Sequence, residues 1–137
     1  MINFTSKPRY DLSDLIRLVH VLRAPGGCPW DAAQTHLSIR RNFLEEAYEA
    51  CEALDCDDAA MLREELGDML FAAVRVASTL ERDPEQALHA ACEKFIRRFT
   101  AMEQTALAEG RPLETLSKDE LLAGWNAQKR VVPGGEQ

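Results

Sequence analysis

Apolar residues recur at intervals of three and four along most of the chain, which is the period of amphipathic helices. The first such stripe consists of Leu12, Leu15, Ile16, Val19 and Leu22. It predicts a helix over residues 11 to about 23, which should end at residues 25–29 because this Pro-Gly-Gly-Cys-Pro segment cannot continue a helix. We expect a loop to follow, carrying Trp30 and Asp31.

Two longer helices are predicted next. One should begin near Ser38 as N-cap and run to about residue 54; the other should span residues 59 to about 80, with Asp57 or Asp58 as its cap. The expected inward-facing positions of the first are Phe43, Ala47, Ala50 and Leu54. Those of the second are Leu62, Leu66, Met69, Ala73, Val74 and Ala77.

The remainder of the chain predicts two more helices. Asp83 followed by Pro84 is a start signal, and Gly110 should end that helix. We expect it to bury Leu88, Cys92, Phe95, Phe99 and Met102. Ser117 and Glu120 form a capping box for a short last helix. Since no strand pattern is present, the predicted fold is an all-α bundle of four to five helices, forming a single domain over residues 1–137 with an ordered core over 11–130 and a flexible tail over 131–137.

Composition narrows the function classes. The formal net charge of −7 argues against a general nucleic-acid binder, which needs a basic face. No apolar run is long enough to span a bilayer, and the N-terminus lacks a signal pattern, so we expect a cytoplasmic protein with no membrane partner. The four cysteines show no metal-site spacing and are expected to be reduced thiols.

Paired carboxylates are the main candidates for chemistry. Glu46 and Glu49 lie three apart in one helix, and Glu65 and Asp68 lie three apart in the next, so each pair shares a helix face. Both pairs lie at or beside the apolar stripe of their helix. Because the connection between the helices is short, the helices should pack as a hairpin, and the four acids should converge.

Converging carboxylates repel one another unless protons or metal ions intervene. Oxygen ligands without histidine or thiolate suit Mg²⁺, with Mn²⁺ as a substitute. A solvated acidic surface is the alternative, but two pairs in phase with two apolar stripes favour a metal site. A di-iron site would require E-x-x-H motifs, and none of the three histidines has that spacing.

Cations and one aromatic residue follow the acids. Lys94, Arg97 and Arg98 cluster in the fourth predicted helix, where Lys94 and Arg98 can reach one phosphate chain from the same side. Trp125 and Lys129 lie four apart in the last helix. Taken alone, Lys94, Arg97 and Arg98 are better explained as an exposed basic face, and Trp125 as a core residue.

From residue 15 to residue 129 the sequence resembles the MazG family of nucleoside triphosphate pyrophosphohydrolases. The resemblance rests on an ordered set of segments: G-G-C-P-W-D at 26–31, and residues 34–35, 44–49, 63–71, 94–99 and 125–129. It implies the all-α NTP pyrophosphatase fold and Mg²⁺-dependent hydrolysis between the α and β phosphates, which yields a nucleoside monophosphate and pyrophosphate. It also implies a homodimer or higher homo-oligomer, which would complete the bundle.

The resemblance further implies residue roles. The family's metal ligands fall on Glu46, Glu49, Glu65 and Asp68. Its substrate contacts match Lys94, Arg98, Trp125 and Lys129, with Arg97 beside them and Asn42, Arg63 and Glu64 as weaker matches. Cys92 departs from the family, where Asn is common, and residues 99–102 replace a frequent His-Pro-His-Val-Phe segment.

In the predicted mechanism the four acids hold Mg²⁺, which activates a water. Glu45 or a ligand carboxylate accepts the proton, while Lys94 and Arg98 offset charge on the leaving pyrophosphate. One alternative is a relative specialised for dUTP, dCTP or phosphoribosyl-ATP. A second is an inactive helical nucleotide sensor or adaptor, and a third is an oligomerisation module whose acids bind no metal.

Overall fold

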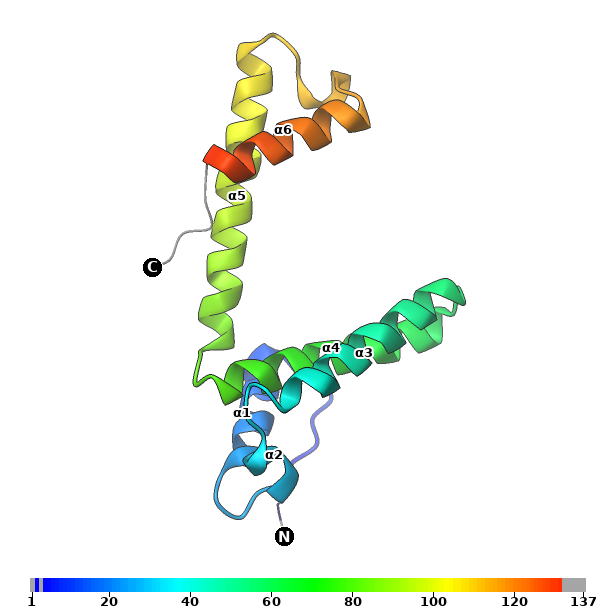
Figure 1. Ribbon diagram of the computed structural model, residues 1–137, viewed down its shortest axis with the longest axis vertical. Helices are drawn as coiled ribbons and strands as arrows, with labels where there is room; N and C mark the ends of the chain where they lie inside the picture. The colour runs from blue at the N-terminus through cyan, green and yellow to red at the C-terminus, as the bar shows by residue number, and fades with distance from the viewer. Residues whose placement is uncertain (1, 3, 132–137) are drawn as a thin grey trace. The chain divides into compact units, whose positions relative to one another are not determined.

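The computed structural model describes residue 2 and residues 4–131, and these contain helices and no strand. The helices are α1 (Leu12–Arg23), α2 (Pro29–Ala33), α3 (Ile39–Asp55), α4 (Ala59–Thr79), α5 (Pro84–Ala108) and α6 (Lys118–Val131), with a 3₁₀ turn at Leu113–Thr115 (Figure 1). The predicted all-α fold is confirmed. None of the described helices combines the length and apolarity needed to cross a membrane.

The chain divides into two units, Met1–Glu85 and Gln86–Gln137, which are described separately below. The single domain expected over residues 1–137 stays a prediction. The flexible tail expected over 131–137 lies outside the described residues except for Val131, which is the last residue of α6.

Helix α1 begins as its sequence predicts. The side chain of the N-cap residue Asp11 accepts a hydrogen bond from the Asp14 amide at 2.9 Å, and the Asp14 carboxylate accepts one from the Asp11 amide at 3.3 Å. This reciprocal capping box satisfies two amides that the first turn leaves without helical partners. Lys7 adds a 2.5 Å ion pair to the largely buried Asp14.

The segment after α1 corrects one prediction, because residues 29–33 form the short helix α2 where a loop was expected. Pro29 is its first residue, a position where the missing N–H costs nothing and the fixed φ suits a helix. The chain before it folds tightly onto the end of α1, and the Cys28 amide donates to the Leu22 carbonyl at 2.7 Å. A Cβ at Gly27 would clash with the carbonyl oxygens of Val21 and Leu22, which explains the glycine.

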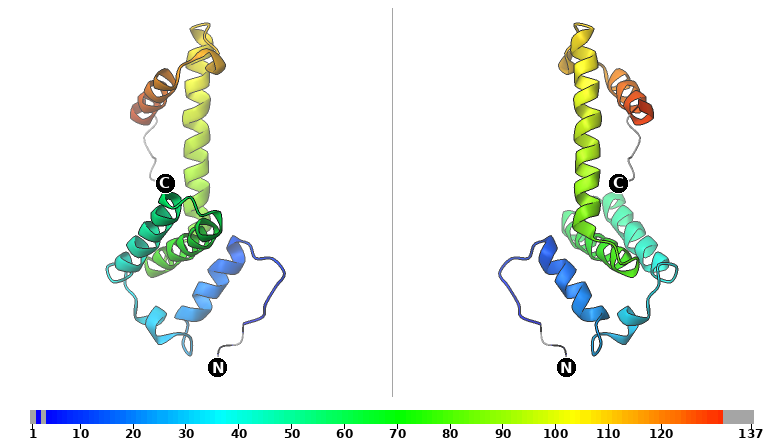
Figure 2. Two further views of the ribbon diagram at one scale, coloured as in Figure 1. Left: turned by 90° about the vertical axis from the view of Figure 1, so that its right-hand side faces the viewer. Right: turned by 90° about the vertical axis from the view of Figure 1, so that its left-hand side faces the viewer.

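Helices α3 and α4 form a hairpin and lie side by side, with α1 against α4 (Figure 2). Asp58 caps α4 by accepting from the Ala60 and Met61 amides, each at 3.0 Å. Ser38 does not cap α3 as expected, because its backbone is already helical and its side chain makes no capping bond. The Thr35 hydroxyl takes this role and accepts from the Ser38 amide at 3.2 Å.

The buried face of this hairpin agrees only in part with the predicted one, since Ala50 and Val74 are buried as expected. The buried apolar residues of the first unit are Val19, Ile39, Ala50, Ala53, Ala72 and Val74. Phe43 and Leu54 on α3, and Leu66 and Ala73 on α4, are exposed although we expected them to face inward. The alanines allow the two helices to pack closely, and a pair of helices forms only one layer, so the neighbouring stripes stay uncovered.

A buried ion pair fastens α2 to α4. Arg75 Nε lies 3.0 Å from Oδ1 of Asp31, whose side chain is 5% exposed. The Arg75 guanidinium also lies over the rings of Phe71 and Trp30, at 4.5 and 5.4 Å from their centroids. Arg23, at the end of α1, donates to the Asp31 carbonyl at 2.6 Å. Three helices therefore meet at Asp31.

The second unit contains nearly all of α5 together with α6. Asp83 accepts from the Glu85 amide at 2.9 Å and marks the predicted start of α5, and Gly110 follows its end with a φ of +69°. Ser117 and Glu120 form the predicted capping box of α6, with two bonds at 2.9 Å and one at 3.3 Å. Met102 is buried as expected. The predicted burial of Leu88, Cys92, Phe95 and Phe99 is wrong for the described chain, because all four are exposed within a unit that has only one other long helix.

Candidate metal centre on the α3–α4 hairpin

Three of the four predicted metal ligands come together on the hairpin. Glu46 and Glu49 are one turn apart on α3, and Glu65 reaches them from α4. Each offers one carboxylate oxygen, and these three oxygens lie within 4.8 Å of one another. An ion placed among them could contact carboxylates of both helices.

Helix phase explains this convergence. Glu46 is partly buried and continues the buried line of Ile39, Ala50 and Ala53 on α3. Glu65 is partly buried on α4, two turns before the buried Ala72. Both acids therefore lie on the contact face of the hairpin, whereas Glu49 is exposed at its edge.

The cluster is electrostatically unfavourable without a cation. Partial burial, followed by the charges of Glu49 and Asp68, raises the pKa of Glu65 above its ordinary value. Among the described residues of the first unit, no lysine or arginine forms an ion pair with Glu46, Glu49 or Glu65. An all-oxygen ligand set that lacks internal cations fits Mg²⁺ or Mn²⁺.

The fourth predicted ligand, Asp68, is exposed one turn after Glu65 on α4 and is not part of the three-oxygen cluster. Its charge nevertheless contributes to the raised pKa of Glu65. The candidate base Glu45 is also outside the cluster, where it accepts a 2.9 Å bond from the exposed Arg41. The weaker substrate candidates Arg63 and Glu64 are exposed in the first half of α4.

Asn42 has a closer relation to the cluster than the sequence suggested. Its Nδ2 donates to Oε1 of Glu46 at 2.9 Å, from one turn earlier on α3. Its Oδ1 is buried, and no described group bonds to it. The sequence signal for this contact was the spacing of four residues between Asn42 and Glu46.

The stronger predicted substrate contacts belong to the second unit. Lys94 and Arg98 are partly buried one turn apart on α5, and Arg97 is exposed. The Trp125 ring lies 5.2 Å, centroid to centroid, from Phe95, so this tryptophan packs between α6 and α5. Lys129 is exposed on α6.

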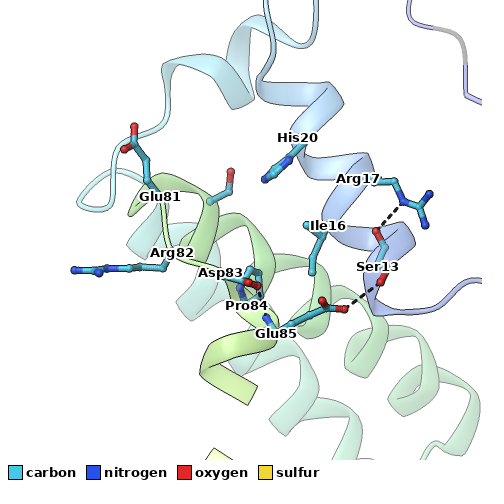
Figure 3. Close-up of a pocket in the computed structure, with 10 residues that line it drawn as sticks. Ser13, Ile16, Arg17, His20, Glu81, Arg82, Asp83, Pro84 and Glu85 are labelled. Carbon is cyan, nitrogen blue, oxygen red and sulfur yellow. Dashed lines mark hydrogen bonds between the residues drawn. The ribbon is translucent and has the colours of Figure 1, made fainter. Parts of the chain in front are cut away.

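A separate pocket lies in the first unit around α1 and the end of α4 (Figure 3). Ile16 and His20 line it from α1, and the Ser13 hydroxyl donates across it to Glu85 at 3.0 Å. None of the sequence-predicted site residues lines this pocket. Its lining carries both charge signs, so it does not favour ligands of either charge.

The family model for the MazG nucleotide pyrophosphohydrolase domain matches residues 34–102, which contain the whole α3–α4 hairpin. The chain belongs to the MazG family. The match includes all four predicted metal ligands, together with Lys94, Arg97 and Arg98.

Three relatives are similar to the chain. The uncharacterized protein YabN of Bacillus subtilis is 30% identical over 126 residues, which is 89% of this chain and 24% of that protein. The nucleoside triphosphate pyrophosphohydrolase of Mycolicibacterium smegmatis is 35% identical over 125 residues, 90% of this chain and 37% of that protein. The nucleoside triphosphate pyrophosphohydrolase/pyrophosphatase MazG of Thermotoga maritima is 40% identical over 89 residues, which is 62% of this chain and 35% of that protein. The chain thus spans between 24% and 37% of the length of these relatives.

Proposed function

We propose that this MazG-family chain hydrolyses nucleoside triphosphates between the α and β phosphates and requires Mg²⁺, for which Mn²⁺ can substitute. The observation that supports this most is the approach of Glu46, Glu49 and Glu65 within 4.8 Å on the contact face of the hairpin. The names of two relatives, from M. smegmatis and T. maritima, agree with this reaction class.

In this proposal Glu46, Glu49 and Glu65 hold the ion, and Asp68 completes the ligand set from the next turn of α4. When bound, Mg²⁺ polarises phosphate oxygens and lowers the pKa of a water. Glu45 or one of the ligand carboxylates accepts the proton of the attacking water.

The remaining roles belong to cations and one aromatic residue. Lys94 and Arg98 bind the phosphate chain and offset the charge of the leaving pyrophosphate, with Arg97 beside them. Trp125 and Lys129 contact the nucleoside end. Arg63 and Glu64 are further substrate contacts.

Partners and location extend the proposal. We expect a homodimer or higher homo-oligomer, because Leu66 and Leu70 on α4 are 50% and 63% exposed beside the acids, and a second copy could cover them. We also expect a cytoplasmic protein that binds nucleotides rather than nucleic acid, given its net charge of −7. Sedimentation analysis of wild type and Leu70→Glu tests the oligomer; a monomeric wild type would refute it.

The decisive experiment measures release of monophosphate and pyrophosphate from a panel of ribo- and deoxyribonucleoside triphosphates, with Mg²⁺ and with EDTA. We expect Mg²⁺-dependent pyrophosphate release that Glu65→Gln abolishes. Glu52→Gln is the matched control, since it removes an exposed glutamate from α3 that is not part of the cluster.

Each alternative predicts a different result. Turnover of dUTP or dCTP alone would indicate a specialised relative. Binding without turnover would indicate a sensor or adaptor, and absence of any metal effect would indicate an oligomerisation module.

A further inference from the structure

The Asn42 side chain is fixed by its contact with Glu46. Positions four apart on a helix are neighbours, and Asn42 Nδ2 lies 2.9 Å from Glu46 Oε1. An ionised carboxylate only accepts hydrogen bonds, so the amide must turn its NH₂ end toward Glu46. The carbonyl end, Oδ1, then faces the other way.

That carbonyl oxygen lacks a partner. Oδ1 of Asn42 is buried, and among the described residues no donor bonds to it. Buried polar atoms in folded proteins are nearly always bonded, so an exception requires an explanation. The nearby carboxylates of the cluster cannot provide one, because they have no proton to donate when ionised.

The other end of the amide explains why an asparagine stands here. An unbonded buried acceptor destabilises a protein, and alanine at this position would avoid that cost. The contact for which the side chain is retained is therefore the 2.9 Å bond from Nδ2 to the Glu46 carboxylate, which belongs to the three-oxygen cluster.

The preceding residue on α3, Arg41, makes a surface contact for comparison. Arg41 bonds Glu45 with the same spacing and the same 2.9 Å distance as Asn42 and Glu46. The Arg41 and Glu45 side chains are 88% and 53% exposed. The Asn42 contact is instead partly buried and involves a cluster acid.

We infer that Asn42 is a positioning residue of the metal centre: its Nδ2 holds the Glu46 carboxylate in the orientation in which it approaches Glu49 and Glu65. This inference rests on the proposed metal-dependent function. It assigns Asn42 to the metal rather than to the nucleotide.

The test compares Mn²⁺ binding to wild type and to Asn42→Ala, measured through the EPR signal of the free Mn²⁺ that remains. Thermal unfolding of both proteins is measured in EDTA and in Mn²⁺. We expect affinity to fall about tenfold, the lower end of the effect of losing a residue that supports a metal ligand. We expect the melting temperature in EDTA to be equal or higher, because alanine favours the helix and the unbonded oxygen is gone. Arg41→Lys, which keeps the charge of the neighbouring pair, should leave Mn²⁺ affinity unchanged.

The outcomes separate this inference from the proposed function. Wild-type affinity in Asn42→Ala, while Glu65→Gln loses Mn²⁺, would overturn the role of Asn42 and leave the metal centre standing. A lower melting temperature in EDTA with an intact Mn²⁺-induced gain would show that Asn42 only braces the helix. A wild-type protein that binds no Mn²⁺ would overturn both.

Discussion

The ion pair between Asp31 and Arg75 should be the most sensitive polar contact of the first unit. Arg75→Ala removes the 3.0 Å bond to Asp31 and both ring contacts. It leaves the Asp31 carboxylate, with a side chain 5% exposed, without its cation. An unpaired buried charge is among the most destabilising changes a protein can undergo.

The expected loss follows from this burial. Removing one partner of a buried pair costs about 3–5 kcal/mol. Because the Arg75 side chain is 24% exposed, water can reach the site, and the lower end of about 3 kcal/mol applies. Arg75→Lys keeps the charge and loses the planar stacking on Phe71 and Trp30, which should cost about 1 kcal/mol.

Urea unfolding measures these differences, with the fluorescence of Trp30 as the probe in a Trp125→Phe background. Arg41→Ala is the matched control, because it breaks an ion pair of similar length, 2.9 Å, that is exposed, and should cost at most about 0.5 kcal/mol. A loss below about 1 kcal/mol for Arg75→Ala would refute the argument, since the pair would then behave like a surface ion pair.

Three further predictions concern glycines and titrating acids. Gly67→Ala should stabilise the protein by about 1 kcal/mol in thermal unfolding, because Gly67 lies within a helix and the new Cβ meets no atom within 4 Å. Gly27→Ala should destabilise it by about 1–3 kcal/mol, because its Cβ would clash with backbone atoms. The hydrogen bond from Lys7, and after it that from the Asp11 amide, lowers the pKa of Asp14. Asp14→Asn should therefore lower the free energy of unfolding at neutral pH, and this loss should disappear as the pH falls through the lowered pKa. A difference in stability that does not change with pH would contradict this. Glu65 has a raised pKa. In EDTA the Glu65→Gln variant should therefore have a higher melting temperature than wild type at neutral pH, and the same melting temperature at pH values below the ordinary glutamate pKa. A variant that is less stable than wild type at neutral pH would contradict the repulsion among the cluster carboxylates.

Helix starts could be predicted from the sequence because a capping side chain bonds to an amide only two or three residues further along the chain. Asp11, Asp58, Asp83 and Ser117 all lie at the predicted starts and bond to amides two or three residues later. Ser38 failed because Thr35 offers the same chemistry three residues earlier, and that earlier turn displaced the cap.

The candidate site was predictable in its residue types and in its phase on each helix. Their phase with the apolar stripes and the short connection between the helices predicted that Glu46, Glu49 and Glu65 converge, and the hairpin brings their oxygens within 4.8 Å. Asp68 shares the spacing but is not in that cluster, because the spacing of two side chains does not determine the direction in which each points. The unbonded oxygen of Asn42 depends on side-chain packing, which the sequence pattern does not report.

The sequence by itself therefore determined the all-α class, most helix starts and the acids that approach one another. Each of these depends on contacts within one helical turn or across one short connection. The tertiary structure decided which stripe of α3 and α4 is buried, and it paired Asp31 with Arg75, which lie 44 residues apart. Such choices depend on which helices pack together, and an apolar stripe records only that a helix face can be buried, not what covers it.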